Sequence, residues 1–507
     1  MNYFSFRKIT IPFFVFITGA CVLIIEILAT RILSPYFGNT IFSVSSIISV
    51  VLLALSMGYY TGGKLADKYP QEKLFYGIIT ASGLSVILLH LLGIVFLSRF
   101  GYKLSIVQGP IISAMLLFFL QSFLLGMLSP FAIKLQAMRF QTMGIGSVSG
   151  QIFFWSTFGS IFGSLSAGFF LIPNFGINKI ILSIGFLLIV LGISSLLKVR
   201  LLLKVLFIIT LFMGVAFFTN PAVTKSGSYT YEGVYQKITV YDGEFEKKPA
   251  RFLLQDRNSS AAAFINSPDL VYEYTKYYAL YSIFTPKVKE ALVIGGGAYS
   301  VPKALLADLP KATIDVAEIE PSLFDISKEY FGVPNDPRLH NIVEDGRRLL
   351  SDSDKKYDFI FSDAYASLYS TPSHLTTLEF FATAKSKLND DGIFMANVIG
   401  NLSPILPSLA LSEMKTFKTV FPNSYFFATR SPALPTLQNL IFIGYNSANH
   451  INVADVNIKK NKNPIISGLA EKEIDVSTFD FSVYPVLTDD FSPVEYLTAK
   501  ELERSHY

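Results

Sequence analysis

The sequence predicts a membrane-embedded α-helical bundle followed by an α/β domain with a parallel sheet. The chain of 507 residues is 51% hydrophobic and only 16% charged, which is too apolar for one soluble domain. Long apolar runs fill the first 220 residues, and charges and turn residues return at ordinary density after "FFTNPAVTKSGS". From Glu290 onward, strand-like segments alternate with helix-like segments, an order typical of a parallel sheet with helical crossovers.

The first part contains apolar runs that each supply the roughly 20 residues needed to cross a bilayer. We count seven, at about 9–33, 40–63, 74–98, 104–132, 146–172, 178–197 and 201–219. Two runs carry glycines four residues apart, Gly58 with Gly62 and Gly159 with Gly163, a spacing that lets helices approach closely. We therefore expect a multi-pass protein of the cell (inner) membrane whose first partner is the lipid bilayer.

Glu26 lies in the middle of the first apolar run, where an ionisable side chain is costly. Its nearest partner in sequence is Arg31, which could instead extend to the membrane interface. A substrate or ion role for these two residues and an internal structural ion pair are both open.

Composition argues against several other classes of protein. The net charge of +4 is small and the basic residues are scattered, so we expect no nucleic-acid partner. The single cysteine, Cys21, cannot form an intramolecular disulfide. The sequence contains no zinc or iron-sulfur ligand pattern, and we expect no metal.

We divide the chain into a transmembrane domain (1–220), a small β region (221–285) and a Rossmann-like α/β domain (286–507). Segments such as "QKITVYDG" and "ARFLLQDRNSS" predict the strands of the β region. In the last domain, "ALVIGGG", "TIDVAEIE", "YDFIFSDA" and "GIFMANVIG" predict parallel strands, and a ligand is expected at their carboxyl ends.

Acidic and glycine residues follow the first of these strands in a pattern that predicts an adenosine site. Gly295, Gly296 and Gly297 form a turn at which backbone N–H groups can approach a ligand. Glu318 ends the next strand and could accept hydrogen bonds from two ribose hydroxyls. A nicotinamide fingerprint would require glycine in place of Ser300.

The segment "EDGRRLL" adds Asp345 beside Gly346, where a carboxylate could accept a hydrogen bond from the exocyclic amine of adenine. The alternative interpretations are a plain tight turn for the glycines and helix caps for Glu318 and Asp345.

With these residues in place, 230–400 resembles the spermidine synthase family, aminopropyltransferases built on the class I methyltransferase-like fold. The shared segments, in order, are "YQKITVYD", "LLQD", "VIGGG", "AEIE", "EDGRRLL", "YDFIFSDAY" and "LTTLEFF". The membrane half, in "TGACVLIIEILATRILSPYFGNT" and "GQIFFWSTFGSIFGSLSAGFFLIPNFG", resembles integral-membrane members of this group. The resemblance implies S-adenosylmethionine, or its decarboxylated form, as the donor substrate.

The resemblance also implies roles for individual residues. Gly295 and Gly297 match the cofactor turn, and Asp363 matches the catalytic aspartate. Tyr365 and His374 lie on the following loop, where His374 could act as a base, bind the acceptor or simply bond the loop. Further candidates for the substrate site or a loop closing over it are Gln236, Asp256, Tyr274, Asp489 and Asp490. The last two could alternatively cap the C-terminal helix.

Two departures from the family pattern concern the acceptor. Polyamine-forming enzymes carry aspartates where this chain has Ala298 and Ala366. Because burying an ammonium without a partner is costly, we expect an acceptor other than a simple polyamine, or none. Delivery of a small-molecule acceptor from the lipid phase is one hypothesis.

The predicted activity is therefore transfer, cyclisation or elimination of the donor's C3 arm with release of methylthioadenosine. The alternatives are an S-adenosylmethionine-dependent methyltransferase, a transporter of polyamine or a related product with an adenosine-sensing domain, and a catalytically silent binding module. The sequence leaves a homo-oligomer open.

The predicted topology contains a conflict. Lysines and arginines gather on alternate connections, and the positive-inside rule places these, with the N-terminus, in the cytoplasm. Seven crossings would then put the donor-binding domain outside the cell, although its donor is cytoplasmic. We keep a cytoplasmic domain and question the count, because the run 104–132 contains Pro110 and Pro130 and could hold an additional or re-entrant pass.

Overall fold

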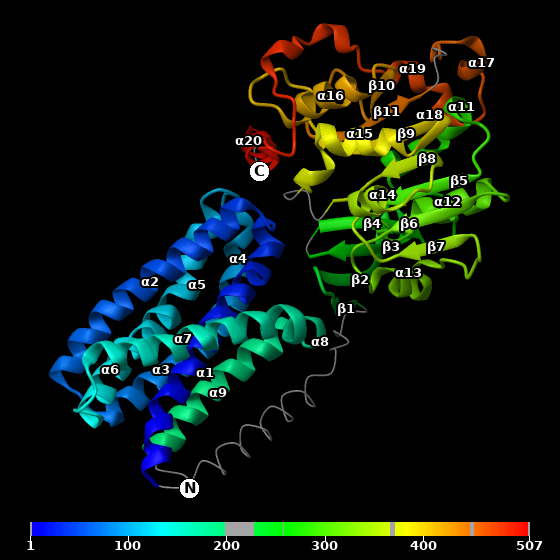
Figure 1. Cartoon of the computed structure of the whole chain (residues 1–507). Coiled ribbons are helices and arrows are strands. Elements are labelled where there is room, and N and C mark those ends of the chain that lie inside the picture. Colours follow the sequence, from blue (N-terminus) through cyan, green and yellow to red (C-terminus); the bar gives the residue numbers. More distant parts are fainter. Residues whose placement is uncertain (1–2, 198–227, 257, 366–370, 447–450, 505–507) are drawn as a thin grey trace. The chain divides into compact units, whose positions relative to one another are not determined.

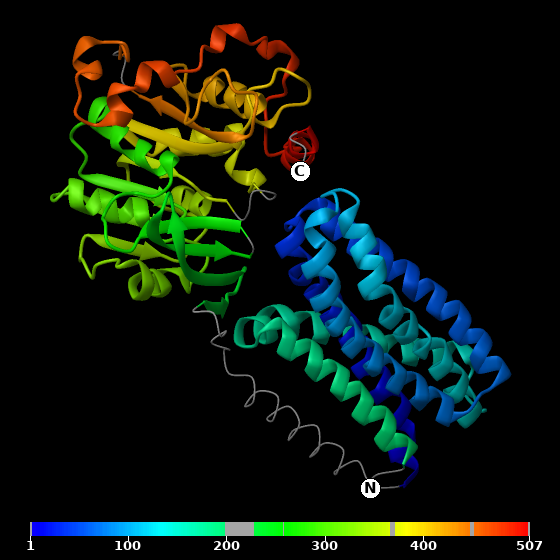
Figure 2. The same cartoon turned by 180° about the vertical axis from the view of Figure 1, so that it is seen from behind.

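The computed structural model describes residues 3–197, 228–256, 258–365, 371–446 and 451–504 (Figure 1). The chain forms two compact units, Met1–Ala222 and Val223–Tyr507, and each has its own hydrophobic core. The first is all helical and the second is an α/β unit with a small β sheet at its start (Figures 1 and 2), so the predicted fold class is confirmed.

The N-terminal unit is a bundle of long helices joined by short turns. Its helices are α1 (Tyr3–Phe37), α2 (Ile41–Lys68), α3 (Glu72–Leu92), α4 (Ser98–Phe100), α5 (Gly109–Gly126), α6 (Leu128–Arg139), α7 (Ile145–Ser166), α8 (Ile172–Asn174) and α9 (Ile177–Leu196), with the π-helical segments η1 (Gly93–Leu97) and η3 (Ala167–Leu171) and the 3₁₀ helix η2 (Gly101–Lys103). Among the described residues, six helical segments are long and apolar enough to cross a membrane: Ile11–Phe37, Ile41–Lys68, Glu72–Phe100, Gly109–Arg139, Ile145–Asn174 and Ile177–Leu196.

These segments test part of the predicted number of membrane crossings. The run predicted at 104–132 forms one segment, Gly109–Arg139, so the suggestion of an additional or re-entrant pass there is wrong. The helix continues through Met127 with a backbone hydrogen bond from its N–H to the carbonyl of Phe123. The seventh predicted span, 201–219, lies outside the described residues. The side of the membrane on which the second unit lies stays a prediction.

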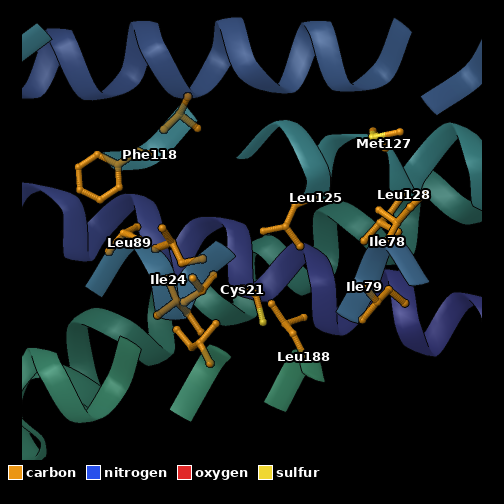
Figure 3. Packing of buried hydrophobic residues seen from close by; sticks show 14 of the residues in the cluster. Cys21, Ile24, Ile78, Ile79, Leu89, Phe118, Leu125, Met127, Leu128 and Leu188 are labelled. Atoms are coloured by element: carbon orange, nitrogen blue, oxygen red, sulfur yellow. The ribbon is translucent and has the colours of Figure 1, made fainter. Parts of the chain in front are cut away.

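The glycine pairs allow the close helix packing expected of them. A Cβ atom at Gly58 would collide with the carbonyl oxygen of Phe123 on α5, and one at Gly159 would collide with that of Phe16 on α1. Around these contacts, side chains from α1, α3, α5 and α9 fill the interior of the bundle (Figure 3), including Cys21 and Leu188. Glu26 and Arg31 are both half-buried on α1 within this unit.

The C-terminal unit begins with a four-stranded antiparallel sheet in the order β1-β2-β3-β4. The strands are β1 (Tyr229–Glu232), β2 (Lys237–Phe245), β3 (Lys248–Gln255) and β4 (Asn258–Phe264). Apolar residues of this sheet, such as Ile238 and Leu253, pack with Leu323 and Ala298 of the larger part of the unit. This contact joins the small sheet to the predicted donor-binding edge.

The larger sheet has seven strands in the order β10-β11-β9-β8-β5-β6-β7. They are β5 (Glu290–Ile294), β6 (Thr313–Ala317), β7 (Leu339–Ile342), β8 (Tyr357–Ser362), β9 (Leu388–Gly400), β10 (Ser424–Ala428) and β11 (Gln438–Tyr445). Strands β5 to β9 are parallel, and β11 pairs antiparallel with both β9 and β10. This order, with β5 central and β11 inserted between β9 and β10, is that of the class I methyltransferase-like fold.

Helices cover both faces of this sheet because successive strand residues point to opposite sides. Val293 of β5 packs in one core with η4 (Glu273–Leu280), α11 (Tyr281–Phe284), α12 (Ser300–Asp308) and α13 (Leu323–Phe331). Its neighbour Ile294 packs in the other core with α14 (Gly346–Asp352), α15 (Leu378–Ser386) and α16 (Leu409–Val420). The remaining elements are η5 (Ser373–Leu375), α17 (Val456–Lys459), α18 (Pro464–Ser467), α19 (Leu469–Lys472), η6 (Val476–Thr478), η7 (Phe481–Val483) and α20 (Val494–Arg504).

Candidate active site

The glycine turn follows β5 at the carboxyl edge of the sheet. Gly295 and Gly297 have φ values of 93° and 52°, which favour glycine. A Cβ atom at Gly295 would also collide with the carbonyl oxygen of Asp363, whose N–H donates to the carbonyl of Ile294 at 2.8 Å. The turn and the predicted catalytic aspartate are therefore in direct contact.

Glu318 lies against the same turn. Its Oε2 accepts hydrogen bonds from the N–H groups of Gly296 at 2.8 Å and Gly297 at 3.4 Å, and its Oε1 accepts one from the N–H of Glu320 at 2.9 Å. Burial raises the pKa of the Glu318 carboxyl, and these three N–H groups oppose that rise. Since α13 begins later, at Leu323, Glu318 does not cap that helix and the cap interpretation is wrong for this residue.

Asp345 both caps a helix and contacts the side chain of His374. It is the N-cap of α14, where its Oδ1 accepts a hydrogen bond from the N–H of Arg348 at 3.0 Å. Its Oδ2 lies 2.8 Å from Nε2 of His374, and this hydrogen bond holds the pKa of Asp345 below its usual value. The next residue, Gly346, packs so closely on Ile294 that a Cβ atom would collide with that side chain.

Asp363 follows β8 and has a raised pKa. Burial raises its pKa to about 6, while hydrogen bonds from Asn397 and Tyr274 lower it. The Nδ2 of Asn397 donates to Oδ1 of Asp363 at 2.8 Å. Oδ1 of Asn397 in turn accepts from Nδ2 of Asn439 at 2.9 Å, which fixes the orientation of the amide. Asn397 and Asn439 each interrupt an otherwise apolar strand, and these polar residues were the sequence feature that could have predicted a hydrogen-bonding role for them.

The hydroxyl of Tyr365 forms two hydrogen bonds with the backbone of β9. It donates to the carbonyl of Asn397 at 3.1 Å and accepts from the N–H of Ile399 at 3.0 Å. Burial holds the pKa of Tyr365 well above its usual value. Tyr365 therefore braces the segment that carries Asp363, and its proton is directed at a carbonyl group.

The C-terminal segment reaches the same edge through Arg347, a residue to which the sequence analysis gave no role. Arg347 donates two hydrogen bonds to Asp489, at 2.7 and 2.5 Å, and one to the carbonyl of His374 at 3.0 Å. Thr377 also donates to Asp489 at 2.8 Å. Asp490 is exposed. Because α20 begins only at Val494 and Asp489 bonds elsewhere, a helix cap is not the role of Asp489.

Gln236 and Asp256 lie in the small sheet. Gln236 is buried in the β1–β2 loop, where its carbonyl accepts from the N–H of Gly233 at 2.9 Å. Asp256 has a φ of 56° at the end of β3, and its Oδ1 accepts from the N–H of Lys237 at 3.0 Å. Tyr274, by contrast, lies on η4 and donates a hydrogen bond to the carboxyl of Asp363.

A buried acid near Tyr365 was not predicted from the sequence. Glu413 on α16 is 1% exposed, and its Oε1 has no hydrogen-bond partner among the described residues. Burial, aided by nearby Glu501, raises the pKa of Glu413 to about 8. Glu501, from α20, accepts from the N–H groups of Leu409 at 2.7 Å and Ala410 at 3.3 Å at the start of α16. The signal in the sequence was an acid at helical spacing between two apolar residues, Leu409 and Phe417.

The two positions that lack family carboxylates differ in what can be said of them. Ala298 is 2% exposed and packs in an apolar cluster with Ile238 and Leu323. Ala366 lies outside the described residues. Within the described part of the chain, no group of three His, Cys, Asp or Glu side chains is arranged to hold a metal.

Comparison with known proteins agrees with this geometry. Residues 278–455 match the family described as "Spermine/spermidine synthase domain". The chain carries a spermine/spermidine synthase domain. It is 33% identical over 150 residues to the polyamine aminopropyltransferase of Vibrio vulnificus (strain CMCP6), covering 29% of this chain and 48% of the relative. The chain thus spans about half the length of that relative.

Two further matches extend the comparison. Polyamine aminopropyltransferase 2 of Aquifex aeolicus (strain VF5) is 23% identical over 411 residues, covering 75% of this chain and 77% of the relative. That alignment is longer than the whole C-terminal unit, so it extends into the helical unit. The crystal structure of a probable spermidine synthase from Corynebacterium glutamicum ATCC 13032 is 21% identical, covers 51% of this chain and 95% of that chain, and gives a TM-score of 0.44.

Proposed function

We propose that this membrane protein is a transferase that takes the C3 arm of decarboxylated S-adenosylmethionine, or of S-adenosylmethionine itself, and releases methylthioadenosine. The observation that carries the proposal is Asp363, whose backbone contacts the glycine turn and whose carboxyl has a raised pKa. The synthase domain and the aminopropyltransferase names of its relatives support the same reaction class.

The donor would bind across three strand ends. Glu318 would accept hydrogen bonds from the ribose hydroxyls through lone pairs that its backbone contacts leave available. Asp345 would accept one from the exocyclic amine of adenine through Oδ2, the oxygen that faces His374. Donor binding would therefore weaken or replace the contact between Asp345 and His374.

Asp363 would act as general base. The lone pair of an amine nitrogen attacks the carbon attached to the sulfonium, the new N–C bond forms, and the C–S bond breaks with its electrons going to sulfur. The leaving group is neutral methylthioadenosine, and the proton lost by the amine goes to Asp363. With a pKa of about 6, most of this carboxyl is ionised at neutral pH and ready to accept that proton. Alignment of the nucleophile supplies the remaining acceleration.

We propose an acceptor other than a simple diamine. The apolar packing of Ala298 offers nothing to a second ammonium. Glu413, with a pKa of about 8, is mostly uncharged at neutral pH, and ionising it to pair with an ammonium at pH 7 costs about 1.4 kcal/mol. An acceptor with one amine, delivered in water or from lipid, fits these groups better.

The test is product analysis with the purified full-length protein. We would supply either donor with putrescine or with a total lipid extract, and measure methylthioadenosine and adducts by mass spectrometry. Asp363→Asn should lower methylthioadenosine release by roughly 10²- to 10⁴-fold, the usual range for a general base. Asp390→Asn, at an exposed aspartate on β9, is the matched control.

Other products would change the assignment. Release of S-adenosylhomocysteine would make the protein a methyltransferase. Tight binding of an adenosine ligand without turnover would make it a binding module, and polyamine uptake that persists in Asp363→Asn would favour transport.

A further inference from the structure

The side chain of His374 occupies the oxygen that we assign to adenine. His374 lies on η5, and its Nε2 is 2.8 Å from Oδ2 of Asp345. This is the oxygen through which Asp345 would accept a hydrogen bond from the exocyclic amine of the donor. The imidazole and the amine would therefore compete for one acceptor, so the contact between His374 and Asp345 bears on how tightly the donor binds.

Asp345 does not need His374 to hold its orientation. Its Oδ1 accepts a hydrogen bond from the N–H of Arg348 at 3.0 Å, and the N–H of Arg347 also donates to this carboxylate. Both donors belong to the first turn of α14, so they fix the carboxylate as the N-cap of that helix. Removal of the imidazole would leave the carboxylate in place with an acceptor position available.

The backbone of His374 is anchored, whereas its ring can turn. Nη1 of Arg347 donates to the carbonyl of His374 at 3.0 Å, and the N–H of Thr376 donates to the carbonyl of Ser373 at 3.2 Å. The His374 side chain is 48% exposed, so rotation about its Cα–Cβ bond would move the ring into water without displacing the loop. Entry of adenine would thus require one side chain to rotate and not the loop to open.

The charged groups around His374 come from three elements. Asp345 and Arg347 belong to α14, Glu379 to the first turn of α15, and Asp489 to the segment before α20. Arg347 pairs with Asp489 at 2.5 Å, and the N–H of Asp489 donates to Glu379 at 2.9 Å. The pKa of Asp489 is held below its usual value by Arg347 first, and to a smaller extent by His374. Because Arg347 already neutralises Asp489, a protonated His374 acts most directly on Asp345.

We propose that His374 is a positioning residue that sets the affinity for the adenine of the donor by competing for Oδ2 of Asp345. At low pH the imidazole carries two N–H groups and a positive charge, so its hydrogen bond to the carboxylate becomes charge-assisted and stronger. Adenine binding should therefore weaken as pH falls through the range in which histidine gains its proton. The inference rests on the adenosine site of the proposed function and adds to it a residue that opposes donor binding.

The probe is methylthioadenosine, which contains adenine and has no group that titrates between pH 6 and pH 8. We would measure its binding to the purified full-length protein by isothermal titration calorimetry at both pH values. At pH 6, His374→Ala should bind methylthioadenosine about two- to fivefold more tightly than the native protein, the range expected for loss of a half-exposed ion pair. At pH 8 the difference should fall below about twofold, because neutral histidine makes the weaker contact.

Two further variants and a second ligand separate competition from other effects. His374→Gln keeps a side-chain N–H donor that does not titrate, so its affinity should be the same at both pH values. His340→Ala is the matched control, because His340 is 51% exposed and lies 3.0 Å from Asp315, whose other partner Lys355 precedes β8 at the opposite edge of the sheet. It should keep the native affinity and the native pH dependence. Methylthioinosine has a carbonyl group in place of the amine, so it should gain nothing from His374→Ala.

Equal affinity of His374→Ala and the native protein at pH 6 would overturn the inference and leave the proposed function standing. Weaker binding by His374→Ala would also overturn it, because the imidazole would then support adenine. An equal gain for methylthioadenosine and methylthioinosine would refute competition, because the ring would then act through its bulk and not through Asp345. If methylthioadenosine bound neither to the native protein nor to His340→Ala, the adenosine site of the proposed function would fail, and this inference with it.

Discussion

Replacing Asn397 by leucine should shift the acid limb of the pH–rate profile upward. In the native protein the pKa of Asp363 is about 6, and the hydrogen bond from Asn397 Nδ2 at 2.8 Å is the first cause that lowers it. Leucine has nearly the same volume and cannot donate, so the carboxylate loses a partner while the packing of β9 is largely kept.

The magnitude follows from the strength of that bond. A hydrogen bond to a charged group is worth roughly 1.5–3 kcal/mol, which corresponds to roughly 1–2 pKa units. The pKa of Asp363 should therefore rise from about 6 to roughly 7–8 in Asn397→Leu. At pH 7 the ionised fraction would fall from about nine-tenths to between a half and a tenth, and activity would recover at pH 9.

The assay is methylthioadenosine release under kcat/KM conditions between pH 5 and 9, because kcat/KM reports the free enzyme. The chain offers a matched control at the other end of the same strand, where Nδ2 of Asn389 donates to Asp358 at 2.6 Å. Asn389→Leu should leave the acid limb in place. Loss of activity in Asn397→Leu with an unshifted limb, and no recovery at high pH, would show that Asp363 is not the titrating base.

Two further predictions concern groups around the site. The pKa of Glu413 in the folded protein is raised from 4.5 to about 8, so the native protein loses stability as pH rises between these values. Glutamine does not titrate. The stability of Glu413→Gln relative to the native protein should therefore increase by roughly 2–4 kcal/mol from pH 5 to pH 8. Thermal unfolding at both pH values measures this, with exposed Glu471→Gln as control, and a constant difference would contradict it. A double-mutant cycle of Arg347→Ala and Asp489→Asn, read out as donor affinity, should give a coupling of about 1 kcal/mol, because their paired hydrogen bonds tie the C-terminal segment to α14. Strictly additive effects would show that this ion pair does not support the donor site.

The sequence was sufficient for the parts of the site that lie at strand ends. Glu318, Asp345 and Asp363 each follow a strand, and parallel strands place their carboxyl ends on one edge. The glycine turn was predictable for the same reason. In the helical unit, the spacing of Gly58 and Gly62 predicted close packing, although it did not indicate which helix would approach them.

Other groups required the folded chain. Asn397 and Asn439 lie on different strands, and their alignment on Asp363 depends on the antiparallel register of β9 and β11. Arg347 and Asp489 are 142 residues apart, so nothing local in the sequence joins them.

The sequence by itself determined the order of a bundle of candidate membrane helices and an α/β domain, because apolar run length and strand periodicity are local properties of the chain. It also placed Glu318, Asp345 and Asp363, the candidate donor-binding acids, on one edge of the sheet, since their positions follow from strand order. Only the tertiary structure decided how the pKa values of the acids are shifted. Burial of Asp363 and Glu413, and the hydrogen bonds that Asn397 and Tyr274 donate to Asp363, depend on residues distant in sequence, because a pKa is set by what surrounds a group in space.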